Sequence, residues 1–156
     1  MLQTPTLTVA AIEKGTAIDH ITAGQALKIV RILGITQHKK QVALGLNLPS
    51  AQLGLKDIVK IEDREISPQE ANQIALFAPN ATINIIENFV VSKKFQVCLP
   101  HTIANLVVCP NSRCISRCEP ISSLFHVQQR QHTVYLSCHF CNKCFLQEEI
   151  LEYQHH

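Results

Sequence analysis

Two stretches near the C-terminus, CPNSRC at 109–114 and CHFCNKC at 138–144, carry five of the seven cysteines of this 156-residue chain. A sixth cysteine, Cys118, follows shortly after the first stretch. Pairs of thiols that are each closed by a tight turn, with a hairpin-sized insert between the pairs, are typical of tetrahedral zinc sites. The sequence therefore predicts that four of these cysteines form one metal cage.

Spacing alone leaves the choice of the four ligands open. The favoured set combines a C-x4-C pair with a C-x2-C pair: Cys109, Cys114, Cys138 and Cys141. A second geometrically possible set is Cys114, Cys118, Cys141 and Cys144, and three imidazoles lie nearby, those of His126, His132 and His139. A surface or packing role is the simpler expectation for each histidine, because four thiolates already complete a structural zinc site.

A cage closed by four thiolates leaves no coordination position for a substrate, so it predicts a structural metal and not a catalytic one. The second half of the chain is short and buries too little apolar surface to be stable without a staple. Structural zinc binds with about 10–16 kcal/mol, which exceeds the stability of such a module. Zinc is therefore expected to decide whether this half folds.

Composition sets broad limits on the kind of protein. The net charge of +2 is too small to favour nucleic acid, and charges of both signs are interspersed. The sequence shows neither an 18-residue apolar run nor a secretory signal pattern at its start. We therefore expect a cytoplasmic chain with no membrane contact, whose thiols stay reduced, and with Cys98 as an ordinary buried or half-buried thiol.

The first half alternates between two apolar periodicities. Strands are predicted at 6–12, 41–48, 55–63 and 81–91, with Val42, Leu44, Leu46 and Leu48 on one face of the second. The first helix is predicted to begin at a Thr22–Gln25 capping box, to bury Ala26, Leu27, Ile29, Val30 and Leu33, and to end at Gly34. The second is predicted to begin at a Ser67–Glu70 box with Pro68, and to bury Ala71, Ile74, Phe77 and Ala78 before Pro79.

This β-α-β-β-α-β order predicts an α+β protein with a ferredoxin-like, split βαβ N-terminal domain. The concentration of cysteines and the charges and proline in 93–104 predict a boundary there, giving domains 1–97 and 98–156. The second domain is predicted as a small antiparallel β zinc module. Its predicted strands are 104–108, 124–129 and 133–137, with a helix at 145–152.

No nucleotide-loop, zinc-protease or zinc-deaminase motif is present in the sequence, so we do not expect an enzyme. Several charged side chains near predicted strand ends could bind an anion, although solvated edge lysines are the commoner explanation: Asp19, His20, Lys56, Lys60, Lys93 and Lys94.

The main alternative is a zinc-ribbon adaptor for nucleic acid, and the basic and aromatic residues it would use are Arg113, Arg117, Arg130, Lys143, Phe125, Tyr135 and Phe140. A small zinc enzyme, which would need an open metal position, is the other alternative.

Several stretches resemble the regulatory chain of aspartate carbamoyltransferase, in consistent order from about residue 7 to 146. They are GTAIDHI (15–21), GLNLPS (45–50), GLKDIVKIE (54–62), ALFAPNATIN (75–84), NLVVCPNSRCIS (105–116) and EPISSLF (119–125). The resemblance implies a non-catalytic subunit that binds the effectors CTP, UTP and ATP in its N-terminal domain. It also implies a homodimer, with three such dimers linking two catalytic trimers in pyrimidine biosynthesis.

The resemblance further implies one structural zinc ion per chain on Cys109, Cys114, Cys138 and Cys141, which leaves Cys118 and Cys144 as spare thiols. The implied nucleotide-binding residues are Ile12, Ala17, Asp19, His20, Lys56, Lys60, Asn84, Ile86, Phe89, Val91 and Lys94. By this likeness Lys94 and Lys56 would meet the phosphates, while Asp19 and Lys60 would hold the ribose region.

The catalytic-chain interface implied by the resemblance comprises Asn111, Arg113, Arg130, Asn142 and Lys143. Arg113 and Asn142 depart from the family residues, so the polar detail of this interface is expected to differ here. Ala10 stands where the family can have an acidic residue, and Phe89 where it can have tyrosine. The loss of a charge at Ala10 is expected to alter the effector response.

Overall fold

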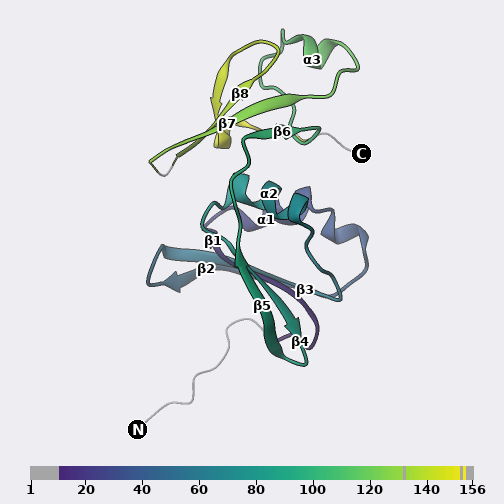
Figure 1. Cartoon of the computed structure of the whole chain (residues 1–156), viewed down its shortest axis with the longest axis vertical. Helices are drawn as coiled ribbons and strands as arrows, with labels where there is room; N and C mark the ends of the chain where they lie inside the picture. Colours follow the sequence, from purple (N-terminus) through teal and green to yellow (C-terminus); the bar gives the residue numbers. More distant parts are fainter. Residues whose placement is uncertain (1–10, 132, 152, 154–156) are drawn as a thin grey trace. The chain divides into compact units, whose positions relative to one another are not determined.

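The computed structural model describes residues 11–131, 133–151 and 153 of the chain. The chain divides into two compact units, Met1–Cys98 and Leu99–His156, and each unit contains one antiparallel sheet (Figure 1). The elements of the first unit are β1 (Gly15–Thr22), α1 (Ala26–Ile32), the 3₁₀ helix η1 (Ile35–Gln37), β2 (Val42–Ser50), β3 (Gly54–Glu62), α2 (Pro68–Phe77), β4 (Thr82–Glu87) and β5 (Val90–Gln96).

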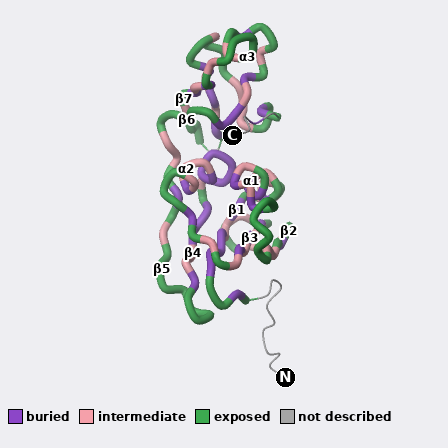
Figure 2. Tube along the Cα trace, turned by 90° about the vertical axis from the view of Figure 1, so that its right-hand side faces the viewer, coloured by how far each residue is buried: buried purple, intermediate pink, exposed green. Residues whose placement is uncertain are grey.

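The first unit has the predicted ferredoxin-like arrangement with one strand added. Its strands are ordered β2-β3-β1-β4-β5, and both helices cover the same face of the sheet (Figure 1). The core between helices and sheet includes Ile18, Ile61 and Ile83 from three neighbouring strands, and Ile29 and Ile74 from the helices, all fully or almost fully buried (Figure 2). The α+β fold expected from the sequence is confirmed.

The position predicted for the first strand is wrong. The strand before α1 is β1, at Gly15–Thr22, whereas Ala11 and Ile12 lie outside any strand and residues 6–10 lie outside the described part of the chain. The alternation of apolar and polar residues expected of a strand is not visible in GTAIDHIT, because Thr16 is a fully buried polar residue. A register shift between Ile18 and Ile21, with His20 at a φ of 56°, also interrupts the strand.

The run 81–91, predicted as one strand, is instead the centre of a hairpin. Asn88 and Phe89 have φ values of 51° and 65°, the left-handed conformations that a tight two-residue turn requires. The hairpin pairs β4 with β5, which extends to Gln96. A segment predicted as part of the domain boundary is therefore an edge strand of the first sheet.

The leucines of β2 do not share one face, contrary to the alternation in the sequence. The register between β2 and β3 shifts between Gly45 and Leu48. Leu44 consequently pairs with the buried Val59, while Leu48 pairs with Lys56 on the other face of the sheet. One extra residue reverses every later side chain, because strand side chains alternate with a period of two.

The N-terminus of α1 is capped from a distant strand and not by the predicted capping box. Gln25 precedes the helix without a side-chain cap, and Leu27 is 60% exposed and so outside the buried stripe. The fully buried carboxylate of Asp57 on β3 accepts hydrogen bonds from the N–H groups of Gly24 (2.9 Å) and Ala26 (3.2 Å). Its other oxygen accepts from the N–H of Asn47 (2.9 Å) in the shifted part of β2. A single carboxylate thus joins three segments.

The predictions for the helix ends are otherwise confirmed. Gly34, at a φ of 60°, follows the last residue of α1 and its C-cap. Ser67 accepts from the N–H of Glu70 (3.2 Å), whose carboxylate accepts from the N–H of Ser67 (3.2 Å), and Pro68 begins α2. The reciprocal bonds satisfy two donors that a helix start otherwise leaves unpaired.

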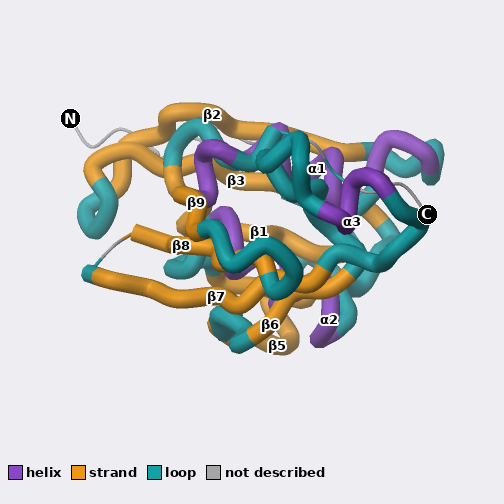
Figure 3. Tube along the Cα trace, turned by 90° about the horizontal axis from the view of Figure 1, so that it is seen from above, coloured by secondary structure: helices purple, strands orange, loops and turns teal. Residues whose placement is uncertain are grey.

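The second unit contains a four-stranded sheet of order β6-β7-β8-β9. Its elements are β6 (Thr102–Ala104), the short helix α3 (Ile115–Cys118), β7 (Leu124–Arg130), β8 (Thr133–Cys138), β9 (Cys144–Leu146) and the 3₁₀ helix η2 (Gln147–Glu149). Strands β7 and β8 match the prediction and lie side by side (Figure 3). The predicted strand 104–108 is wrong, since only Ala104 belongs to β6 and Val107 forms an isolated bridge to Tyr153.

The helix predicted at 145–152 is also wrong. Phe145 and Leu146 pair with Leu136 and Tyr135 on β8, and only η2 makes a helical turn. Pairing with an existing strand overrides the local helix preference of this segment. Among the helices of the described residues, none is long and apolar enough to cross a membrane.

The Asp57→Ala substitution is expected to lower the free energy of unfolding of the first unit by about 3 kcal/mol or more, because three N–H groups lose their acceptor. Urea unfolding followed by circular dichroism measures the change. Asp57→Asn, which keeps one acceptor oxygen, should lose less. Glu65→Ala at an exposed position is the matched control, expected within about 0.5 kcal/mol of wild type. Equal stability of Asp57→Ala and Glu65→Ala would contradict the role of the cap.

Candidate metal centre and effector face

The second unit brings four sulfur atoms together: those of Cys109, Cys114, Cys138 and Cys141 lie within 4.8 Å of one another. The Sγ atoms of Cys109 and Cys141 are 3.8 Å apart, and those of Cys114 and Cys138 are 3.7 Å apart. Zinc–sulfur bonds of about 2.3 Å in a tetrahedron place two sulfurs about 3.8 Å apart. The cluster therefore fits one zinc ion in size and in ligand type.

Two turns present these four ligands. In the first, the N–H of Cys114 donates to the carbonyl of Asn111 (3.0 Å), and α3 follows. In the second, the N–H of Asn142 donates to the carbonyl of Cys138 (2.9 Å), and the N–H of Cys138 donates to the carbonyl of Lys143 (2.9 Å). Cys138 ends β8, so the sheet itself fixes one of the four ligands.

The thiols of the cluster have unlike acidities. Burial raises the pKa of Cys109 and of Cys138, and neighbouring thiols add to both shifts. Burial also opposes the thiolate of Cys141, but hydrogen bonds from the main chain at Lys143 and the side chain of Asn111 outweigh it and lower the pKa of Cys141 to about 7. Four adjacent thiolates repel one another, and a divalent cation removes that repulsion.

The remaining cysteines lie outside the cluster. Cys118 and Cys144 are exposed, and neither belongs to the four-sulfur group, so the structure supports the first quartet over the alternative one. Cys98 is exposed as well, which corrects the expectation of a buried or half-buried thiol. His126 and His139 are not part of the cluster, and His132 lies outside the described residues.

Four of the residues expected to face a catalytic chain, Asn111, Arg113, Asn142 and Lys143, lie on the two turns that carry the cysteines, whereas Arg130 pairs with Thr133 at the opposite end of β7 and β8 from Cys138. Asn111, between the first two cysteines, is half-buried, whereas Arg113, Arg130, Asn142 and Lys143 are exposed. The guanidinium of Arg130 lies 5.3 Å from the centre of the Tyr135 ring, which fixes its direction. The sequence analysis named Arg117 only as a possible nucleic-acid contact, whereas its Nη1 donates to the carbonyl of Cys109 (2.9 Å) and stabilises the first turn.

In the first unit, strand register gathers the predicted nucleotide-binding residues on the sheet face that the helices leave uncovered. One cross-strand row runs through all five strands: Ala43, Lys60, Ala17, Asn84 and Lys94. A second row contains Glu62, Gly15, Ile86 and Val91. Ile12 packs against Ala17 and Ile86 in a small apolar cluster on this face.

At one end of this face, polar side chains are fixed by one another. The Nζ of Lys56 lies 3.0 Å from Oδ1 of Asp19, and Asp19 also accepts from the N–H of His20 (2.7 Å). Burial raises the pKa of Asp19, but these partners outweigh it, so the pKa lies below its usual value. The Nδ1 of His20 lies 3.1 Å from Oγ1 of Thr82.

The comparison with known proteins agrees with this two-part organisation. Residues 7–98 match the family model "Aspartate carbamoyltransferase regulatory chain, allosteric domain", and residues 101–151 match "Aspartate carbamoyltransferase regulatory chain, metal binding domain". The chain belongs to the family of aspartate carbamoyltransferase regulatory chains. As a regulatory chain it is non-catalytic, and this assignment favours neither a zinc enzyme nor a nucleic-acid adaptor.

Curated relatives with this name cover nearly the whole chain. The regulatory chain of Tolumonas auensis is 48% identical over 146 residues, which are 94% of this chain and 95% of the relative. That of Chromobacterium violaceum is 43% identical over 147 residues, covering 94% and 97% of the two chains. That of Aeromonas hydrophila is 46% identical over 146 residues, covering 94% and 95%.

The open face of the allosteric domain is electrostatically polarised. Near its basic end, a cavity of about 410 Å³ is lined by His20, Gln52, Asn80, Thr82, Lys94, Phe95 and Gln96. Sequence reasoning missed Phe95 and Gln96 because it assigned 93–104 to a boundary and not to β5, and it had no signal for Gln52, Asn80 and Thr82. Lys93, grouped with Lys94 in the sequence, pairs with Ile85 whereas Lys94 pairs with Asn84, so the two lysines point to opposite faces.

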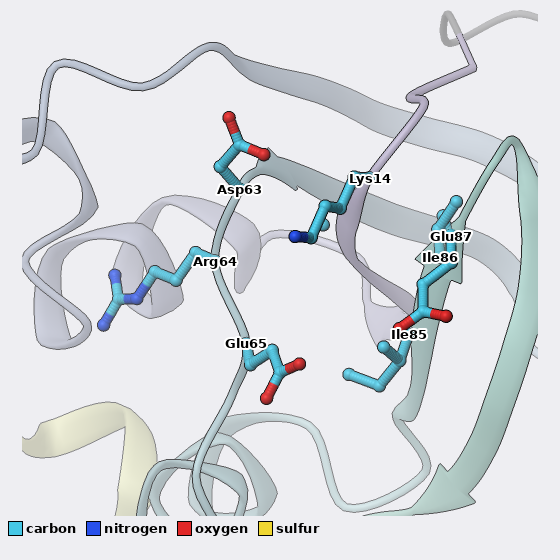
Figure 4. A pocket seen from close by; sticks show the side chains of 8 residues that line it. Lys14, Asp63, Arg64, Glu65, Ile85, Ile86 and Glu87 are labelled. Carbon is cyan, nitrogen blue, oxygen red and sulfur yellow. The ribbon is translucent and has the colours of Figure 1, made fainter.

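The other end of the sheet is acidic. A cavity of about 180 Å³ lies between the start of β1, the segment after β3 and the end of β4, and its lining comprises Lys14, Gly15, Asp63, Arg64, Glu65, Ile85, Ile86 and Glu87 (Figure 4). Figure 4 shows the Arg64 side chain pointing away from Lys14 and Glu87. Carboxylates repel phosphate groups, so this end does not suit a triphosphate.

Substituting any cysteine of the quartet by serine, for example Cys138→Ser, is expected to abolish stoichiometric zinc and unfold the metal binding domain, because three thiolates and a hydroxyl hold the ion too weakly. Atomic absorption and near-ultraviolet circular dichroism measure the two effects. Cys118→Ser and Cys144→Ser are the matched controls and should retain one zinc per chain. Loss of zinc in both control variants would contradict the assignment of the quartet.

Proposed function

We propose that this chain senses cytoplasmic nucleoside triphosphates, CTP, UTP and ATP, on the open face of its allosteric domain and controls an aspartate carbamoyltransferase catalytic chain in pyrimidine biosynthesis. The observation that carries the proposal is the cross-strand row with Lys60 and Lys94 on either side of Ala17 and Asn84. This row places two lysines on the open face of the sheet. Apolar contacts are available in the neighbouring row, where Ile12 packs against Ile86. A nucleotide carries charge at one end and an aromatic base at the other.

The polarity of the face suggests one direction for the ligand. Lys56, Lys94 and His20 lie at the basic end and would meet the phosphates, and the cavity beside Lys94 provides space for them. Asp19, which is paired with Lys56, and Lys60 in the central row would bind the ribose region. Ile12, Ala17, Ile86 and Val91 would contact the base.

Phe89 and Ala10 are two positions where the chain departs from residues that the family can have. The main-chain N–H of Phe89 already donates to the carbonyl of Glu13 (3.0 Å), and its side chain is 65% exposed. The turn at Phe89 is therefore anchored to the segment before β1, and the aromatic side chain is available for contact with a base. Ala10, where the family can carry an acid, lies outside the described residues, and its effect on the sign of the response stays a prediction.

The metal binding domain would dock on the catalytic chain through the rim of the zinc cage. Arg113, Asn142 and Lys143 are exposed on the two metal-held turns, and Ile115 (52% exposed) and Phe140 (37% exposed) add apolar area beside them. Turns that are fixed at both ends by metal lose little conformational entropy on docking. Zinc would thus preorganise the docking surface.

The same chain would pair with a second copy. Strand β2 is at the edge of the five-stranded sheet, and its Leu44 (39% exposed) and Leu46 (47% exposed) are incompletely covered. An exposed apolar edge strand favours association with another strand. Regulatory homodimers of this kind, three in number, would link two catalytic trimers. Nucleotides that bind one quaternary state more tightly than the other would bias the distant active sites by about 1–3 kcal/mol.

Replacing Lys94 by alanine is expected to weaken binding of CTP and ATP by about 10- to 100-fold, because a charge-assisted hydrogen bond to phosphate is lost. Isothermal titration calorimetry on the purified chain measures the affinity. The matched control is Lys93→Ala, which removes the same charge from the opposite face of the same strand and should change affinity little. Equal losses from both substitutions would reject the assigned face.

Removing zinc with a chelator is expected to release the chain from the catalytic chain, because the docking turns lose their common anchor. Size-exclusion chromatography of the assembled complex, with and without chelator, measures the release. Adding zinc back should restore the complex and serves as the control. A complex that remains intact after its zinc content falls to zero would exclude this role of the metal.

A further inference from the structure

Two histidines form a pair on the surface of the metal binding domain, outside the four-sulfur cluster. His126 lies on β7, and His139 directly follows the last residue of β8. The Nε2 atom of His126 is 3.1 Å from the Nδ1 atom of His139, and both residues are exposed. Neither the zinc cage nor the proposed docking residues account for this pair.

The fold holds both imidazoles in place. His126 pairs in register with Ser137, and the N–H of His139 donates to the carbonyl of Leu124 (2.9 Å), so main-chain hydrogen bonds fix both backbones. The His139 ring also meets the ring of Phe140 edge to face, with centroids 5.3 Å apart. The rings of the two histidines are 5.3 Å apart and tilted by 50°. The pair is therefore preorganised, and its two nitrogens meet at the solvent boundary.

The separation of the nitrogens equals that of two neighbouring ligands on one metal ion. With metal–nitrogen bonds of about 2.05 Å and an angle of about 100° at the metal, the two nitrogens lie about 3.1 Å apart. We propose that His126 and His139 form a second, exchangeable site for a divalent transition metal such as Ni²⁺, Cu²⁺ or Zn²⁺, separate from the tetrathiolate site.

The proposed ligand chemistry balances without an added base. In a pair of neutral rings, one facing nitrogen donates its N–H and the other accepts. When a metal ion binds, that proton moves to the other nitrogen of its own ring, and both facing nitrogens present lone pairs to the metal. Within the described residues, no third histidine, cysteine or carboxylate joins this pair, so water molecules complete the coordination sphere.

A metal ion at this site would cross-link β7 to the turn that carries Cys138 and Cys141. Since the site exists only in the folded domain, binding would raise the unfolding midpoint in proportion to the logarithm of metal concentration above its dissociation constant. Affinity should follow the usual order of imidazole ligands, with Cu²⁺ bound more tightly than Ni²⁺.

The test uses the full chain already loaded with zinc. Ni²⁺ is titrated by calorimetry, paramagnetic broadening of amide resonances locates the bound ion, and a chromogenic indicator records any zinc released. We expect one saturable Ni²⁺ site, broadening confined to residues near 126 and 139, and no zinc release. His126→Gln or His139→Gln should each weaken Ni²⁺ binding about 10²-fold, because the second ligand of a chelate acts at high effective concentration.

The controls separate this pair from other histidines of the chain. His101→Gln removes an exposed imidazole from the same unit, and a double variant, His155→Gln with His156→Gln, removes the C-terminal pair. Both controls should bind Ni²⁺ as wild type does, and all variants should retain stoichiometric zinc as evidence of folding. Unchanged Ni²⁺ affinity in His126→Gln or His139→Gln, or loss of binding in the C-terminal variant, would overturn the proposal.

Discussion

The second half of this protein depends on one constraint, the need of four clustered thiolates for a cation between them. Burial raises the pKa of Cys109 and of Cys138. Sulfur–sulfur separations of 3.7 and 3.8 Å bring the thiolates so close that they repel one another unless a cation lies between them. A zinc ion turns this repulsion into the dominant stabilising interaction of a domain with little apolar core. The turn before α3 and the turn after β8, with the exposed docking residues on them, are held by this cluster.

In the allosteric domain a buried carboxylate has a comparable role, because it holds separate segments together through hydrogen bonds. Asp57 collects main-chain donors from the start of α1 and from the irregular part of β2, while the adjacent Lys56 points to the open face and pairs with Asp19. Two consecutive residues of β3 thus have different surroundings: Asp57 faces the interior and Lys56 faces the open side of the sheet. Adjacent residues of β3 therefore contact the edge strand β2 and the proposed phosphate end.

The distribution of charge on the open face gives the effector proposal its physical content. Lysines at one end, an apolar cluster of Ile12, Ala17 and Ile86, and carboxylates at the other end form a gradient along a sheet whose far side is sealed by helices. A ligand with an anionic end and a flat apolar end matches that gradient. The family assignment supplies the class of protein, and the gradient supplies the orientation proposed for its ligand.

Features that depend on short-range spacing follow from the sequence alone. They are the two cysteine pairs, the capping box at Ser67 and Glu70, the helix end at Gly34 and the β-α-β-β-α-β order of the first unit, and the long resemblance identified the family. Spacing favoured the quartet of Cys109, Cys114, Cys138 and Cys141 but left the second quartet open, because Cys118 and Cys144 also have suitable intervals.

Features that depend on pairing between distant segments became visible in the folded chain alone. The register shifts in β1 and β2 reverse which side chains face the core. Asp57 caps the helix α1, which is distant from it in sequence. Pairing with β8 makes a helix-like C-terminal segment into β9. Local periodicity cannot report these features, because an extra residue or a remote hydrogen bond leaves no mark on the neighbouring sequence.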